Sequence, residues 1–331
     1  MRLSVLPGRR RGETAAAGPA AATVVGPPAQ RSLRRIFDDR LLPVLLVAPA
    51  ILLIAGLIGY PVLRAMWLSL HEAGLAALTT GTMNFVGLDN YVEIMRDPDL
   101  RRSTVTTVLF GLACVVATMA VGIAVALLLN RPFRGRGLLA ILVLLPWAVP
   151  NVATATVWDW LFHDQYGIAN WALTSVGLSG FDGFAWFNQR STAFIVIGLV
   201  IVWGAFPFVS IVLLAGLQTI PAEIVDAARV DGASPWQRTR LITLPMLKSL
   251  LLVLVVISTI WDFKVFDQVY VMTNGGGPAR STEVLSISTY REAFGQSNFG
   301  LGSALGVSLF VILLVVTVVY VRLVKDEEQV S

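Results

Sequence analysis

The chain has 331 residues, of which 56% are hydrophobic and only 14% are charged. Soluble globular proteins carry charge on about a quarter of their residues, so this composition excludes an ordinary soluble domain and favours a membrane protein. The net charge of +4 does not indicate a nucleic-acid partner, because the basic residues lie beside apolar runs, as they do in membrane proteins.

Residues 1–40 are rich in Ala, Gly, Pro and Arg and have no apolar period, which predicts a disordered, basic, cytoplasmic tail. Six continuous apolar runs follow, each long enough to cross a bilayer as a helix. They lie at Leu42–Met66, Val105–Leu129, Leu138–Phe162, Ala193–Leu217, Ser249–Tyr270 and Leu301–Leu323. We therefore predict an all-α, polytopic membrane protein with six transmembrane helices over residues 41–323, followed by a cytoplasmic C-terminal tail over 324–331.

The basic residues predict which side of the membrane each loop occupies. The loops after the second and fourth runs are rich in arginine and lysine, as the tail is: Arg131, Arg134 and Arg136, then Arg229, Arg238, Arg240 and Lys248. Cytoplasmic loops carry such an excess. Both termini are therefore expected in the cytoplasm, and the chain is expected to be multi-pass in the plasma or inner membrane.

The loop between the fourth and fifth runs, residues 218–248, is predicted to form two short helices and is called the two-helix loop below. Pro221 suits the first turn of a helix, and Gly232 suits the left-handed residue that closes one. Ser234 and Gln237 form a capping box, and the second helix is expected to end at Pro245. Taken alone, this pattern also fits an ordinary amphipathic cytoplasmic loop.

The two-helix loop resembles the EAA loop of membrane subunits in binding-protein-dependent ABC importers. The matching residues are Asp226-Ala227-Ala228, Gly232 and Ile242-Thr243-Leu244-Pro245, with Asp226 where glutamate is usual. The resemblance implies that this loop docks on a cytoplasmic ATPase and couples its cycle to transport. The residues assigned to coupling are Glu223, Asp226, Ala227, Ala228, Asp231, Gly232, Ala233, Leu244 and Pro245.

Two further stretches resemble carbohydrate-importing members, in particular the larger membrane subunit of maltose, trehalose and glycerol-phosphate transporters. They are Phe85-Val-Gly-Leu-Asp-Asn-Tyr91 and Phe266-Asp-Gln-Val-Tyr270 with Thr273-Asn-Gly-Gly-Gly-Pro278. The resemblance implies the type I ABC importer permease fold and half of a translocation path for a di- or oligosaccharide or a sugar-like solute. It also implies three kinds of protein partner: a second homologous permease subunit, two copies of a cytoplasmic ATPase and an extracytoplasmic solute-binding protein.

A carboxylate inside the fifth run points to the solute path. Ser258, Asp262 and Val265 share one helix face, and a carboxylate in a membrane span is costly enough to indicate a function. Pairing with Lys264, or a hydrated position near the outer interface, would equally explain Asp262. Aligned through the two-helix loop, these three residues match sugar-facing positions of the maltose transporter, and so do Gly204, Ala205 and Phe208 of the fourth run.

The sequence contains no Gly-x-x-x-x-Gly-Lys-Ser/Thr loop, no metal-ligand spacing and no recognisable catalytic constellation. We therefore expect no enzyme activity, metal or cofactor in this chain, and the partner ATPase would use the ATP and Mg²⁺. Two other hypotheses remain open at this point. One is a secondary carrier that uses an ion gradient through Asp262 and Lys264, and the other is a membrane-bound enzyme.

Overall fold

A computed structural model describes residues 42–328 with the exception of residue 82. The predicted tail over residues 1–40 lies outside the described residues, as do residues 329–331 of the predicted C-terminal tail. The described chain divides into two units, with the boundary after Gly59. In the first unit, helix α2 (Leu42–Ile54) continues into the π-helical turn η2 (Ala55–Gly59). This segment is apolar on every side, which is typical of a helix in a membrane.

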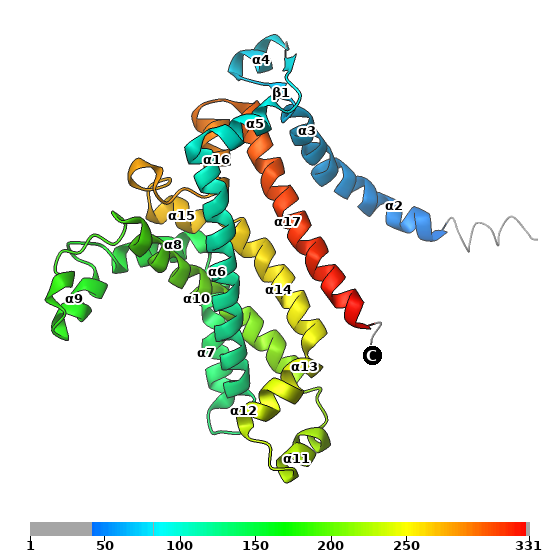
Figure 1. Ribbon diagram of the computed structural model, residues 1–331, viewed down its shortest axis with the longest axis vertical. Coiled ribbons are helices and arrows are strands. Elements are labelled where there is room, and N and C mark those ends of the chain that lie inside the picture. Colours follow the sequence, from blue (N-terminus) through cyan, green and yellow to red (C-terminus); the bar gives the residue numbers. More distant parts are fainter. Residues whose placement is uncertain (1–41, 82, 329–331) are drawn as a thin grey trace, which may run out of the picture. The chain divides into compact units, whose positions relative to one another are not determined.

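The second unit begins at Tyr60 and holds the remaining elements (Figure 1). Its first part comprises α3 (Tyr60–Leu68), β1 (His71–Glu72), α4 (Leu75–Thr80), β2 (Asn84–Phe85), α5 (Asp89–Arg96), α6 (Pro98–Leu129), α7 (Arg136–Ala148), α8 (Asn151–Leu161), α9 (Ile168–Ser175) and η3 (Ser179–Phe181). Its second part comprises α10 (Arg190–Leu217), α11 (Ala222–Val230), α12 (Pro235–Arg238), η4 (Thr239–Thr243), α13 (Leu244–Met246), α14 (Lys248–Phe263), α15 (Asp267–Met272), η5 (Pro278–Arg280), α16 (Leu285–Tyr290), η6 (Arg291–Gly295) and α17 (Phe299–Glu328). Strands β1 and β2 pair antiparallel.

Helix α6 packs against both α10 and α14 at the centre of the second unit. Glycines allow this close approach, as small residues do at helix contacts in membranes. A Cβ on Gly122 would lie 2.5 Å from the Val209 side chain, and one on Gly111 would lie 2.6 Å from the Phe263 ring. The buried residues around these contacts are almost all aliphatic.

Five helical segments of the described chain are long and apolar enough to span a membrane: Val44–Leu68, Pro98–Leu129, Arg190–Leu217, Lys248–Met272 and Phe299–Arg322. The third predicted span, over Leu138–Phe162, is not a single helix, and it makes a sixth candidate span only when its two halves are counted together. Helices α7 and α8 occupy that region and meet at a bend of 96°. Pro146 and Pro150 explain the bend, because proline lacks the N–H that a continuous helix needs and clashes with the preceding turn.

Within the second unit, two groups of connecting segments lie at opposite ends of the long helices (Figure 1). Helices α11 and α12 of the two-helix loop lie at one end. The paired strands, α5 and α16 lie at the other. This separation agrees with the predicted placement of the two-helix loop on one side of the membrane and the loops after the first and fifth spans on the other.

Candidate functional site

The two-helix loop has the local structure that its residue pattern predicts. Gly232 adopts φ +79° and follows α11, where its N–H donates to the Arg229 carbonyl at 3.2 Å. The Ser234 hydroxyl accepts from the Gln237 N–H, and the Gln237 side chain accepts in return from the Ser234 N–H at 2.8 Å. Pro221 precedes α11 as its N-cap instead of lying in the first turn, which equally avoids an unpaired N–H.

The residues assigned to coupling divide between the surface and the interior of the two-helix loop. Ala227 is exposed, whereas Ala228 is only 8% exposed and packs within the loop. Asp226 forms an exposed ion pair with Arg229 at 3.1 Å. The other assigned residues are exposed or half-buried: Glu223, Asp231, Gly232, Ala233, Leu244 and Pro245.

Large apolar side chains stand out from the two-helix loop. Val230 is 86% exposed and Trp236 is 68% exposed. Sequence reasoning did not single out these two residues. Exposed apolar groups that cluster among charged residues are typical of a surface that binds another protein, so the surface of the two-helix loop has the character of a docking site.

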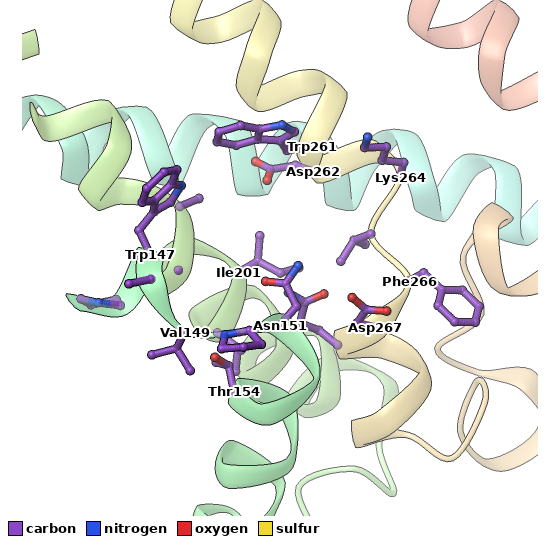
Figure 2. A pocket seen from close by; sticks show the side chains of 18 residues that line it. Trp147, Val149, Asn151, Thr154, Ile201, Trp261, Asp262, Lys264, Phe266 and Asp267 are labelled. Carbon is purple, nitrogen blue, oxygen red and sulfur yellow. The ribbon is translucent and has the colours of Figure 1, made fainter. Parts of the chain in front are cut away.

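A cavity of about 640 Å³, called the central cavity below, lies among α7, α8, α10 and the α14–α15 junction (Figure 2). It contains four of the six predicted path residues: Gly204, Ala205, Asp262 and Val265. Phe208 and Ser258 do not line it. Phe208 packs behind the wall instead, with its ring centroid 5.1 Å from that of Trp261 and 5.9 Å from that of Trp147.

Asp262 is the most unusual group in the central cavity. Asp262 is only 3% exposed, and its Oδ2 atom has no hydrogen-bond partner. No ion pair joins it to Lys264 in the described part of the chain. A buried acceptor without a partner is costly, so a donor supplied by a solute would improve its environment.

The wall opposite Asp262 was missed by the sequence reasoning. Figure 2 shows Asn151 and Thr154, from the start of α8, facing the side that carries Asp262 and Lys264. Pro150 precedes α8 as an N-cap that provides no side-chain acceptor, so the first N–H groups of this helix remain available as donors. The spacing Pro146-x-x-x-Pro150 was the signal that could have located this wall.

The central cavity combines hydrogen-bonding groups with aromatic rings. Acceptors come from Asp262 and Asp267, and donors from Asn151 and Lys264. Rings come from Trp147, Trp261 and Phe266. Such a site suits a polyhydroxylated solute, because hydroxyl groups pair with the polar side chains while C–H faces pack on aromatic rings. Among the described residues, no cluster of His, Cys, Asp and Glu could hold a metal ion.

Comparisons with known proteins agree with this arrangement. Residues 118–328 match the family model described as the inner membrane component of binding-protein-dependent transport systems. The diacetylchitobiose uptake system permease protein DasB of Streptomyces coelicolor is 39% identical over 290 residues, which cover 87% of this chain and 88% of that protein. The trehalose/maltose transport system permease protein MalF of Thermococcus litoralis is 36% identical over 278 residues, covering 84% and 92%.

A solved structure shares the fold. A chain of a bacterial ABC transporter involved in the import of the acidic polysaccharide alginate superposes with a TM-score of 0.75 at 21% identity. The superposition covers 89% of this chain and 98% of that one. The likeness confirms the predicted type I importer permease fold.

Proposed function

The chain belongs to the family of inner membrane components of binding-protein-dependent transport systems, and we propose that it forms half of the path by which an ABC importer takes up a di- or oligosaccharide. Family membership favours this function over the ion-gradient carrier. The observation that carries the sugar assignment is the central cavity, where the unpartnered Asp262 carboxylate and the Asn151 amide face one another among aromatic rings. Relatives that are named for disaccharide uptake support it.

The proposed partners follow from two features: the sequence has no nucleotide-binding loop of its own, and the two-helix loop exposes apolar side chains. We place a second homologous permease subunit across the path, because the five or six spans of one chain enclose too little space for a closed route. Two copies of a cytoplasmic ATPase, which would use ATP and Mg²⁺, dock on the two-helix loops through Val230, Trp236 and the charged groups between them. A solute-binding protein delivers the sugar on the opposite side, and both termini of the chain lie in the cytoplasm.

The test uses the chain reconstituted with its partner subunits in proteoliposomes that contain ATP. Radiolabelled maltose, trehalose and N,N′-diacetylchitobiose serve as probes. We expect uptake of at least one probe that requires both ATP and the binding protein. A chain that transports none of the three, or transports without ATP, would not be the proposed importer subunit.

A pair of proline variants tests the coupling role. Ala228→Pro lies inside α11, where proline breaks the helix at a cost of about 3 kcal/mol or more, and it should abolish uptake and transport-stimulated ATP hydrolysis. Ala222→Pro is the matched control, because it lies at the first position of the same helix, where proline is tolerated. Membrane insertion, measured by immunoblot, should be equal in both. Normal uptake by Ala228→Pro would exclude a coupling role for α11.

A further inference from the structure

A second cavity, of about 430 Å³, opens where α8 ends. Its volume lies within the range of small-molecule sites, about 300–1,000 Å³. Its wall combines carboxylates, amides and a hydroxyl with aromatic rings: Asp159, Asp164, Asn188, Asn274 and Thr273, with Phe162, Trp186 and Phe187. None of these residues was assigned to the solute path from the sequence. The composition resembles that of the central cavity.

The wall of the second cavity is held in place by a buried amide. Asn170 is 5% exposed, and its Nδ2 donates to the carbonyl oxygens of Asp164 at 3.1 Å and Phe184 at 3.0 Å. Its Oδ1 accepts from Nε1 of Trp186 at 2.7 Å. With its N–H satisfied in this way, Trp186 packs at a right angle on Phe162, with 5.2 Å between the ring centroids. The cavity is therefore preformed, which reduces the entropic cost of binding.

One face of α8 joins the two cavities. Asn151, Thr154, Trp158 and Phe162 recur at intervals of three and four residues, so they lie along a single stripe of the helix. Asn151 and Thr154 line the central cavity, and Phe162 lines the second one. Helix α15, which packs along α8, repeats this arrangement: Asp267 and Gln268 line the central cavity and Met272 lines the second.

A row of aromatic rings follows the same course. The Trp158 and Phe162 rings stack with 5.8 Å between their centroids at an interplanar angle of 7°. Trp158 in turn lies 5.8 Å from Trp203, the residue before Gly204 of the central cavity. With Trp186, the row extends from the second cavity to the edge of the central cavity. Aromatic faces bind the C–H faces of sugars without requiring one fixed hydroxyl pattern.

We propose that the second cavity is a carbohydrate subsite, which holds one ring of a neutral sugar before that sugar reaches the central cavity. The proposal rests on the proposed function, because it takes the two-helix loop to be cytoplasmic and the α8–α9 connection to be on the outer side. Asp159 and Asp164 accept hydrogen bonds from sugar hydroxyls, the Asn188 amide supplies a donor, and the rings of Phe162 and Phe187 provide apolar contact. His163 also lines this cavity and pairs with Asp164 at 3.0 Å, so Asp159 is the carboxylate that repels an anionic sugar at this subsite.

The test separates the two cavities by substitution. In the full importer in nanodiscs, Asp262→Leu removes one acceptor of the central cavity, and Asn188→Leu is added to remove a donor of the second cavity. Gln189→Leu is the matched control, since Gln189 is exposed and adjacent but does not line the cavity. Saturation-transfer NMR with millimolar maltose, trehalose and N,N′-diacetylchitobiose reports contact between sugar and protein without the binding protein.

The Asp262→Leu importer should retain saturation transfer to at least one probe. The signal should fall by more than half in Asp262→Leu/Asn188→Leu and persist in Asp262→Leu/Gln189→Leu. In the otherwise wild-type importer, Asn188→Leu should raise the half-saturating concentration of sugar-loaded binding protein for uptake by about three- to tenfold, as expected for the loss of one hydrogen bond.

Two results would overturn the subsite. One is equal saturation transfer in the two double variants. The other is weaker binding of the sugar-free binding protein to Asn188→Leu, which would make the cavity part of a protein interface. The proposed function is rejected by a different result, namely that the wild-type importer takes up none of the three sugars. If the wild-type importer does take up a sugar and either of the two results above is found, only the subsite is rejected.

Discussion

Replacing Gly232 with valine tests whether the bend of the two-helix loop is needed for coupling. The backbone at Gly232 has φ +79°, a conformation that costs an L-residue about 1–2 kcal/mol and is least accessible to β-branched side chains. No atom lies within 4 Å of the position that a Cβ would take, so the cost arises from the backbone and not from collision. A penalty of this size lowers the equilibrium ratio of the bent to the unbent loop by about 5- to 30-fold.

The consequence should appear in transport and not in folding. The bond from the Ala233 N–H to the Ala228 carbonyl, 3.0 Å long, closes α11 only when the chain bends at Gly232, so the variant disorders the surface that carries Val230 and Trp236. We expect uptake and transport-stimulated ATP hydrolysis by the reconstituted importer to fall by as much as about 5- to 30-fold, which is the change in that ratio. The amount of protein in the membrane should not change, because the long helices do not depend on this turn.

Gly135→Val provides the control for backbone strain. Gly135 has φ +87°, and a Cβ added to it would likewise have no atom within 4 Å. It precedes α7 in the loop predicted to share the cytoplasmic side, so the substitution introduces similar strain outside the two-helix loop. Uptake by Gly135→Val should stay close to that of the wild type. Equal loss of uptake in both variants, or no loss in Gly232→Val, would refute the argument.

Two further predictions concern buried polar groups. Asn170→Ala leaves Nε1 of Trp186 without its acceptor, which costs about 1–3 kcal/mol, and hydrogen exchange over residues 164–189 should accelerate; unchanged exchange would contradict the role given to this amide. Burial raises the pKa of Glu283 above its ordinary value of 4.5, although its hydrogen bond to Arg280 and its ion pair with Arg291 oppose the shift. The folded chain therefore holds this proton more tightly than the unfolded chain, so the contribution to stability is present below about pH 4.5 and is lost as the pH rises through the raised pKa. The melting temperature of the wild type relative to Glu283→Gln should fall across that window, and parallel melting curves would be the contrary result.

Local chemistry explains what the sequence predicted well. The left-handed turn at Gly232 and the capping box of Ser234 and Gln237 depend on residues within a few positions of one another, so their backbone geometry follows from residue type. The helical spans follow from long apolar runs, because only internally bonded helices satisfy the backbone in lipid when no barrel pattern is present. Both features, and the family resemblance of the two-helix loop, were confirmed.

The sequence identified residues on the α10 and α14 side of the central cavity but not the α8 wall, because the two walls meet only through tertiary packing. Gly204, Ala205, Asp262 and Val265, which the sequence places on the predicted solute path, line one cavity. Asn151 lies 111 positions before Asp262 in the chain, and no local pattern pairs them. Hydropathy averages over a window and does not detect a bend, so it predicts one helical span over Leu138–Phe162 where the structure has two helices. The prolines that break it carry the missing information.

The break between α7 and α8 and the break between α14 and α15 have a common consequence for transport. Helix α14 ends at Phe263, and α8 begins at Asn151, so each of the two facing groups of the central cavity, Asp262 and Asn151, stands at a helix end. Through α13, η4 and α12, α14 is connected to the two-helix loop, whereas α8 packs along α15 beyond the interruption (Figure 1). Under the proposed function, force applied at the two-helix loop reaches Asp262 along α14 more directly than it reaches Asn151. The distance between these two groups is therefore the quantity that a movement of the loop would change, and a solute held between them would be released when they separate.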